Sequence, residues 1–228
     1  MPAPRVLTIE HEADCPPALL GDWLADAGCA VQVCRPYAGD PLPSLDEHDA
    51  LLVLGGSMAA TDLDQHWWLA PLRDLVRSAA DRGVPTLGVC LGHQVCAAAF
   101  GGTVEPNPRG QQVGLLDVGW TAAAADDRLL AALSTPRRAV QWNDDVVTRL
   151  PEGTVVLART PAGEVQAARF APTVWGVQWH PEADRALVEH WARKDEDRHL
   201  AAGIDQDRVL AGIGDAREEL EKSWRPLA

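Results

Sequence analysis

Short apolar runs alternate with amphipathic stretches along the first hundred residues of the chain. The amphipathic stretches predict helices, the first of which opens at Pro16-Pro17 and ends at Gly28. The apolar runs predict buried strands at 6–10, 31–34, 50–54 and 86–89, and the other helices are expected at 67–82 and 91–100. Alternation of strands and helices in this order indicates a parallel sheet covered by helices on both faces.

After Gly102 the pattern changes to closely spaced short apolar segments. We expect one short helix at 126–133 among them and a closing helix at 183–194. Strands are predicted at 113–118, 139–142, 154–158, 165–170 and 174–179. This spacing indicates a small antiparallel β annex attached to the parallel sheet.

The last part of the chain departs from this plan. A charge-rich break at 195–199 has the composition of a hinge. Apolar residues at near-helical spacing follow within 205–224, although two glycines weaken that helix: Val209, Ile213, Ala216, Leu220 and Trp224. We therefore divide the chain into a domain at 1–194 and a helical extension at 195–228 packed on it, with a partner-docking arm as the alternative.

Cys90 has the most informative surroundings in the sequence. It follows the predicted strand at once, precedes the predicted helix, and is flanked by Gly88 and Gly92. A nucleophile on such a tight strand-to-helix turn is presented in a cleft, and a helix N-terminus favours its thiolate. The alternative is a buried cysteine that only packs.

A second segment, Gln178-Trp-His-Pro-Glu182, ends another apolar strand. His180 can serve as general base for Cys90 and as general acid for a leaving amine, while Glu182 can orient the imidazole. Each residue alone could be an ordinary surface side chain. Together with Cys90 they form the set that nucleophilic acyl transfer requires.

At these residues the chain resembles the class I glutamine amidotransferases. The matching segments are Leu54-Gly-Gly-Ser57, Gly88-Val-Cys-Leu-Gly-His-Gln94 and Gln178-Trp-His-Pro-Glu182, within a likeness from about 5 to about 191. It is most similar to stand-alone proteins like the amidotransferase domain of GMP synthase. The resemblance implies a flavodoxin-like, open and mostly parallel sheet, with the antiparallel annex returning to it.

The resemblance also implies roles for residues around Cys90. The backbone N–H groups of Gly56 and Leu91 are the candidate oxyanion donors, with Gly55 beside the substrate. Gln94, one helical turn after Cys90, is expected to bind the amino-acid end of glutamine. Trp142 and Asn143 are also assigned to the substrate site. Packing in the core is the competing role for Trp142, as it is for Trp120 and Trp179, and His93 is expected to be structural.

Asn143 marks a departure from the family pattern, because related proteins often carry a histidine there. Backbone groups of this loop contact the substrate in the family, so activity can survive the change. The change puts in doubt the signalling from a synthetase partner and the preference for free glutamine.

Composition and charge indicate which partners, cofactors and compartment to expect. A chain of 228 residues fits one domain, and its net charge of −13 disfavours nucleic acid and anionic membranes as partners. The five cysteines lack metal-ligand or disulfide spacing, no apolar run can span a bilayer, and the first residues lack a basic region followed by an apolar one. We therefore expect a cytoplasmic protein without metal or cofactor, and leave its oligomeric state open.

Three functions are consistent with these residues. The first is an amidotransferase subunit that releases ammonia from glutamine, through a γ-glutamyl thioester, for a separate synthetase. The second is a stand-alone hydrolase of γ-glutamyl amides or peptides. The third is a non-enzymatic regulatory protein on the same fold, which the complete set of Cys90, His180 and Glu182 disfavours.

Overall fold

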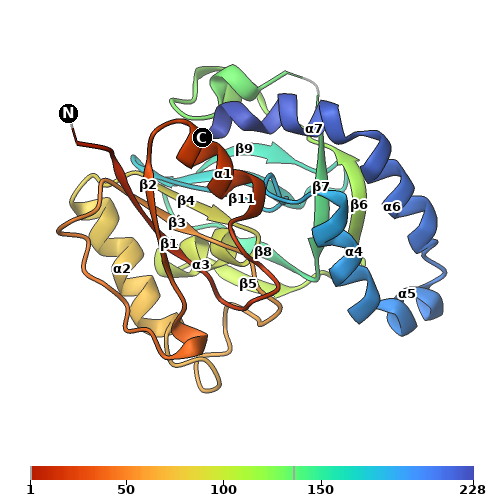
Figure 1. Ribbon diagram of the computed structural model, residues 1–228, viewed down its shortest axis with the longest axis horizontal. Helices are drawn as coiled ribbons and strands as arrows, with labels where there is room; N and C mark the ends of the chain where they lie inside the picture. Colours follow the sequence, from red (N-terminus) through yellow and green to blue (C-terminus); the bar gives the residue numbers. More distant parts are fainter. Residues whose placement is uncertain (1, 136) are drawn as a thin grey trace.

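A seven-stranded sheet forms the centre of the computed structural model, which describes residues 2–135 and 137–228 (Figure 1). Its strand order is β2-β1-β3-β4-β11-β10-β9. The first five strands pair in parallel, whereas β10 pairs antiparallel with β11 and β9. The 2-1-3-4 order of the parallel part is that of flavodoxin-like proteins.

The elements have the following bounds. The strands of the main sheet are β1 (Arg5–Ile9), β2 (Ala30–Cys34), β3 (Ala50–Val53), β4 (Thr86–Val89), β9 (Val155–Arg159), β10 (Val165–Ala171) and β11 (Val174–Val177). Two antiparallel pairs lie outside it, β5 (Thr103–Pro106) with β8 (Asp145–Arg149) and β6 (Gln112–Asp117) with β7 (Arg138–Asn143). The helices are α1 (Ala18–Asp26), α2 (Leu69–Asp81), α3 (Leu91–Ala99), α4 (Arg185–Lys194), α5 (Glu196–Ala202), α6 (Gln206–Asp215) and α7 (Arg217–Trp224).

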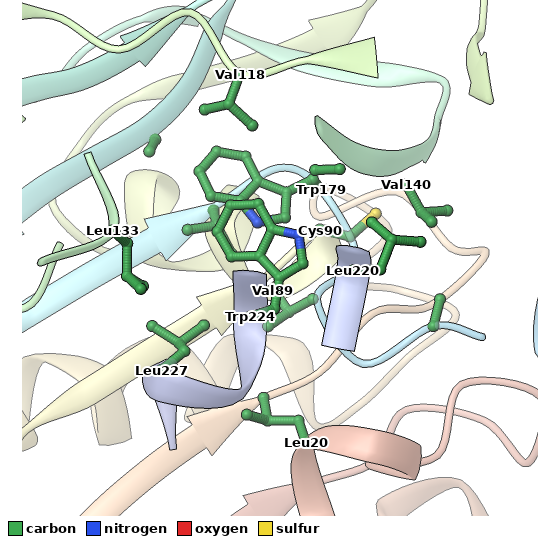
Figure 2. Close-up of a cluster of buried hydrophobic side chains, with 14 of the residues drawn as sticks. Leu20, Val89, Cys90, Val118, Leu133, Val140, Trp179, Leu220, Trp224 and Leu227 are labelled. Carbon is green, nitrogen blue, oxygen red and sulfur yellow. The ribbon is translucent and has the colours of Figure 1, made fainter. Parts of the chain in front are cut away.

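Alternate residues of the strands pack into two separate cores. Leu7 and Val53 face α2 and α3 on one side of the sheet, and Leu52 and Val177 face α1, α4 and the last two helices on the other. This alternation is what a sheet buried on both faces requires. In the second core the indole rings of Trp179 and Trp224 lie against each other, surrounded by aliphatic side chains (Figure 2).

The sequence prediction for the annex was partly wrong. The pair formed by β5 and β8 was missed, since both are short, half-exposed strands with a weak apolar pattern. The helix expected at 126–133 is not α-helical; two 3-10 turns, at Ala122–Asp126 and Ala131–Leu133, overlap the two ends of this stretch. Asp127 interrupts it, because its carboxylate accepts backbone N–H bonds from Leu129 and Leu130.

The region after α4 is helical and packed along one side of the molecule (blue in Figure 1). The expected break at 195–199 is instead mostly part of α5. The expected single helix at 205–224 is divided into α6 and α7 at Ala216. Ile213, Leu220 and Trp224 are buried in the same core as α1. No helix within the described ranges is long and apolar enough to cross a membrane.

Candidate active site

Cys90 lies on a strained turn between β4 and α3. Its φ of 51° and ψ of −105° are unusual for a residue with a side chain, and such strain costs about 1–3 kcal/mol. The turn is held by backbone bonds from Cys90 N to the Val177 carbonyl (2.9 Å) and from Gly92 N to the Leu54 carbonyl (3.1 Å). The turn therefore fixes the thiol at the carboxyl end of the sheet.

The two glycines of the turn are required by contact distances. A Cβ on Gly88 would lie 2.3 Å from the Gly92 carbonyl oxygen, and a Cβ on Gly92 would lie 2.0 Å from the Val53 carbonyl oxygen. Both are shorter than any real contact, so only glycine lets α3 approach β3 and β4 this closely.

His180 follows β11, the strand that pairs with β4. Its Nδ1 lies 2.7 Å from Glu182 Oε1, and both side chains are almost completely buried. Its ring packs against Trp191 with a centroid distance of 4.6 Å. This contact and the carboxylate together fix the orientation of the imidazole.

Opposing effects act on the pKa of His180. Burial lowers this pKa, but the charges of Glu182 and Cys90 and hydrogen bonds to both side chains raise it, and the result is a pKa well above the ordinary value. The imidazole therefore favours its protonated form at neutral pH. A protonated imidazole beside the thiol can donate its proton to a departing nitrogen.

A cleft of about 480 Å³ opens over these residues. Cys90 and His180 line it, together with four residues assigned from the sequence: Gly56, Gln94, Trp142 and Asn143. Gly55 is not part of this lining but lies next to His180, since a Cβ there would be 3.0 Å from His180 Cε1. The structure thus brings together the side chains predicted for chemistry and for substrate binding.

The backbone N–H groups of Gly56 and Leu91 have no hydrogen-bond acceptor among the described residues. Leu91 is the first residue of α3, where helical N–H groups lack partners within the helix. Gly56 must be small, since a Cβ would meet Met58 Sδ at 2.6 Å and Leu91 Cδ2 at 2.9 Å. Both groups are free to donate to a ligand oxygen.

Asn143, the position that departs from the family pattern, is connected to Gln94 through a shared acceptor. Its Nδ2 donates to the Asp145 carbonyl (3.1 Å) and to Gln112 Oε1 (3.1 Å). Gln94 Nε2 donates to the same carbonyl of Asp145 (3.0 Å). The asparagine therefore holds the loop that faces Gln94.

Trp142 combines the two roles weighed from the sequence. Its ring lines the cleft and packs against Trp191 and His199, while its carbonyl oxygen lies 3.9 Å from Cys90 Sγ. Trp120 and Trp179 do not line the cleft and pack with Trp224.

His93 lies outside the cleft. It is fully buried against Phe170 and Gly176, and burial lowers its pKa to about 4. A buried neutral imidazole in an apolar setting packs the core beneath the turn.

Sequence reasoning missed several residues of the cleft wall. Asp145, Lys194 and Asp195 line it, and so do Asp14 and Cys15 from the loop before α1. Burial, helped by nearby acidic groups, raises the pKa of Cys15, so this second thiol stays protonated. No motif indicates these residues, because loops distant in the sequence bring them together.

Comparison with known proteins agrees with this geometry. The family model described as glutamine amidotransferase class-I matches residues 19–190. The glutamine amidotransferase-like protein YfeJ of Salmonella typhimurium is 27% identical, over 98% of this chain and 95% of that protein. The glutamine-hydrolysing GMP synthase subunit of Methanosarcina acetivorans is 38% identical, over 50% of this chain and 56% of the archaeal protein.

Two further comparisons bear on substrate and fold. Gamma-glutamyl peptidase 5 of Arabidopsis thaliana is 26% identical, over 80% of this chain and 72% of the peptidase. A crystal structure of a glutamine amidotransferase from Thermotoga maritima superimposes with a TM-score of 0.87 at 23% identity, covering 98% of this chain and 96% of that one. This last likeness concerns the fold.

Proposed function

The chain belongs to the class I glutamine amidotransferase family, and from this premise we propose that it hydrolyses the γ-amide of glutamine with Cys90, His180 and Glu182. The observation that carries the proposal is the buried His180–Glu182 pair facing a thiol on a strained turn. The fold of a regulatory protein would not need to maintain this strain or a buried histidine–carboxylate pair beside the thiol.

The reaction follows from the positions of these groups. The Cys90 thiolate attacks the γ-carbonyl carbon, and the oxyanion that forms accepts hydrogen bonds from the N–H groups of Gly56 and Leu91. His180 gives its proton to the departing nitrogen as the C–N bond breaks, which leaves a γ-glutamyl thioester. His180 then takes a proton from water, and attack by this water releases glutamate and the free thiol.

The other end of the substrate has a matching site. Gln94 lines the cleft beside the loop of Asn143 and Asp145. Burial and the charges of Asp144 and Asp62 raise the pKa of the Asp145 carboxyl, which has no partner among the described side chains. The α-ammonium group of glutamine would neutralise it.

Ammonia is expected to pass to a separate synthetase. The supporting comparison is the archaeal GMP synthase subunit, a separate chain named for glutamine hydrolysis. A second candidate function is hydrolysis of larger γ-glutamyl amides without a partner. Both the size of the cleft, which lies in the range of sites for drug-sized ligands, and the similarity to a gamma-glutamyl peptidase favour it.

The test is ammonia release from glutamine by the purified chain, alone and with the proteins encoded beside its gene. We expect measurable turnover that Cys90→Ala abolishes. A rise in turnover with a neighbouring synthetase supports release of ammonia to a partner, and faster turnover of γ-glutamyl amides without a partner supports the second candidate. Absence of turnover on every substrate, with and without partners, would refute the proposal.

A further inference from the structure

The lining of the cleft extends from Cys90 and His180 to Trp191, Lys194 and Asp195. Because His180 protonates the departing nitrogen, the leaving amine must lie beside this imidazole. The Trp191 ring packs against His180 and also against Trp142, with the two indole centroids 6.1 Å apart. Both indoles line the cleft, so the leaving group meets an aromatic wall. Ammonia, the leaving group of glutamine, is too small to use it.

Asp195 lies at this wall, where α4 meets α5. Its Oδ2 accepts hydrogen bonds from Trp142 Nε1 (2.9 Å) and Gln111 Nε2 (3.1 Å). Its Oδ1 has no hydrogen bond within the described chain, and the side chain is 26% exposed. The carboxylate is therefore held in place through one oxygen, while the residue lines the cleft and its other oxygen has no partner in the described chain.

Two other carboxylates of the cleft lining are paired with cations. Asp14 pairs with Lys194 and with His190, and Asp144 pairs with Arg198. The cationic groups close to the wall are thus engaged.

Asp195 lacks such a partner. His199 lies 3.8 Å from it, but burial lowers the pKa of this histidine, which favours the neutral ring. The negative charge of Asp195 therefore remains available to a ligand.

We propose that Asp195, with the indoles of Trp142 and Trp191, forms a subsite for a cationic leaving amine. The preferred substrates are γ-glutamyl amides of diamines, whose distal ammonium bonds to Asp195 Oδ1 and whose carbon chain lies along the indoles. An amino-acid leaving group would place its carboxylate near Asp195 and be repelled. The inference rests on the proposed hydrolysis at Cys90 and specifies its substrate class.

The experiment compares substrates that differ only in the distal charge. γ-Glutamylputrescine carries an ammonium, γ-glutamylbutylamide is neutral, and γ-glutamyl-γ-aminobutyrate carries a carboxylate. We expect kcat/KM to fall in this order, with about a tenfold step between the ammonium and the neutral compound, as for one charged hydrogen bond. Glutamine is measured in parallel.

Asp195→Asn removes the charge but keeps an oxygen that can accept from Trp142 and Gln111. This substitution should reduce the ratio of kcat/KM for γ-glutamylputrescine over γ-glutamylbutylamide to about one. Asp197→Asn makes the same charge change on the exposed face of α5, outside the cleft, and should leave that ratio at the wild-type value.

The outcomes separate the two proposals. Turnover of glutamine and of the neutral amide without preference for the ammonium compound overturns the subsite while the hydrolytic function stands. Preference for the carboxylate compound also overturns it. Lack of turnover of all four compounds refutes the hydrolytic function itself. If Asp195→Asn proves unstable on heating, the ranking of the three amides by the wild-type chain decides.

Discussion

Replacing Trp224 with alanine should destabilise the whole fold, although this residue is the last of α7. Its side chain is 1% exposed, packs on Trp179 at a ring distance of 5.0 Å, and donates from Nε1 to the Arg138 carbonyl (3.1 Å). Truncation removes a large apolar group, leaves a cavity and leaves that carbonyl without its donor. Buried tryptophans truncated in this way cost about 3–5 kcal/mol.

The assay is urea unfolding followed by circular dichroism, with thermal unfolding as a second measure. For a chain of this size such a loss lowers Tm by about 6–20 °C, since each kcal/mol corresponds to about 2–4 °C. The control is Trp67→Ala, because Trp67 is 53% exposed, and its effect should stay within about 0.5 kcal/mol. A Trp224→Ala loss below about 1 kcal/mol would show that α7 does not stabilise the core.

Further predictions concern the Cys90 turn, the Glu182 carboxylate and one buried histidine. A glutamine-like electrophile should label Cys90 and none of the other four cysteines, as read by peptide mapping; equal labelling of another cysteine would contradict the assignment. Glu182→Gln should reduce turnover by at least about tenfold, yet less than Cys90→Ala, and steady-state ammonia release checks the order. Gly92→Ala should destabilise by at least about 2 kcal/mol in urea, whereas Gly212→Ala, in open space on α6, should not destabilise. The pKa of His93 is about 4 in the folded state and 6.5 ordinarily, so as pH falls the unfolded state takes up the proton first. The free energy of unfolding should therefore decrease as pH drops from about 6.5 to about 4, by up to about 1.4 kcal/mol per pH unit. His93→Gln should reduce this dependence, as measured by urea unfolding at several pH values.

The parallel half of the fold could be predicted because its strands are continuous apolar runs and its helices have clear apolar stripes. The annex was harder, since β5 and β8 are half-exposed and pair through backbone bonds that carry no sequence pattern. The helix expected at 126–133 does not form, because the Asp127 carboxylate accepts hydrogen bonds from backbone N–H groups and from Arg169 and Trp175. Such tertiary contacts override local helical preference.

The same distinction between residues that can and cannot be predicted from sequence applies to the candidate site. Cys90, His180 and Gln94 stand in motifs with fixed spacing, so their convergence in one cleft could be foreseen. The proposed roles of Asp145 and Asp195 could not be foreseen, because they depend on which other charges in the cleft form ion pairs. That property arises only from the folded arrangement of α4, α5 and the loop before α1.

The packing of Trp224 behind Trp179 has a consequence for the order in which the core is completed during synthesis. The chain emerges from the ribosome with Cys90 first, His180 much later, and α7 later still, and domains assemble as units while translation proceeds. The face of Trp179 that packs against Trp224 remains uncovered until α7 has been made. The nascent chain therefore carries the Cys90 turn before the helix that completes the core behind it exists, and that core is complete only when α7 has been made.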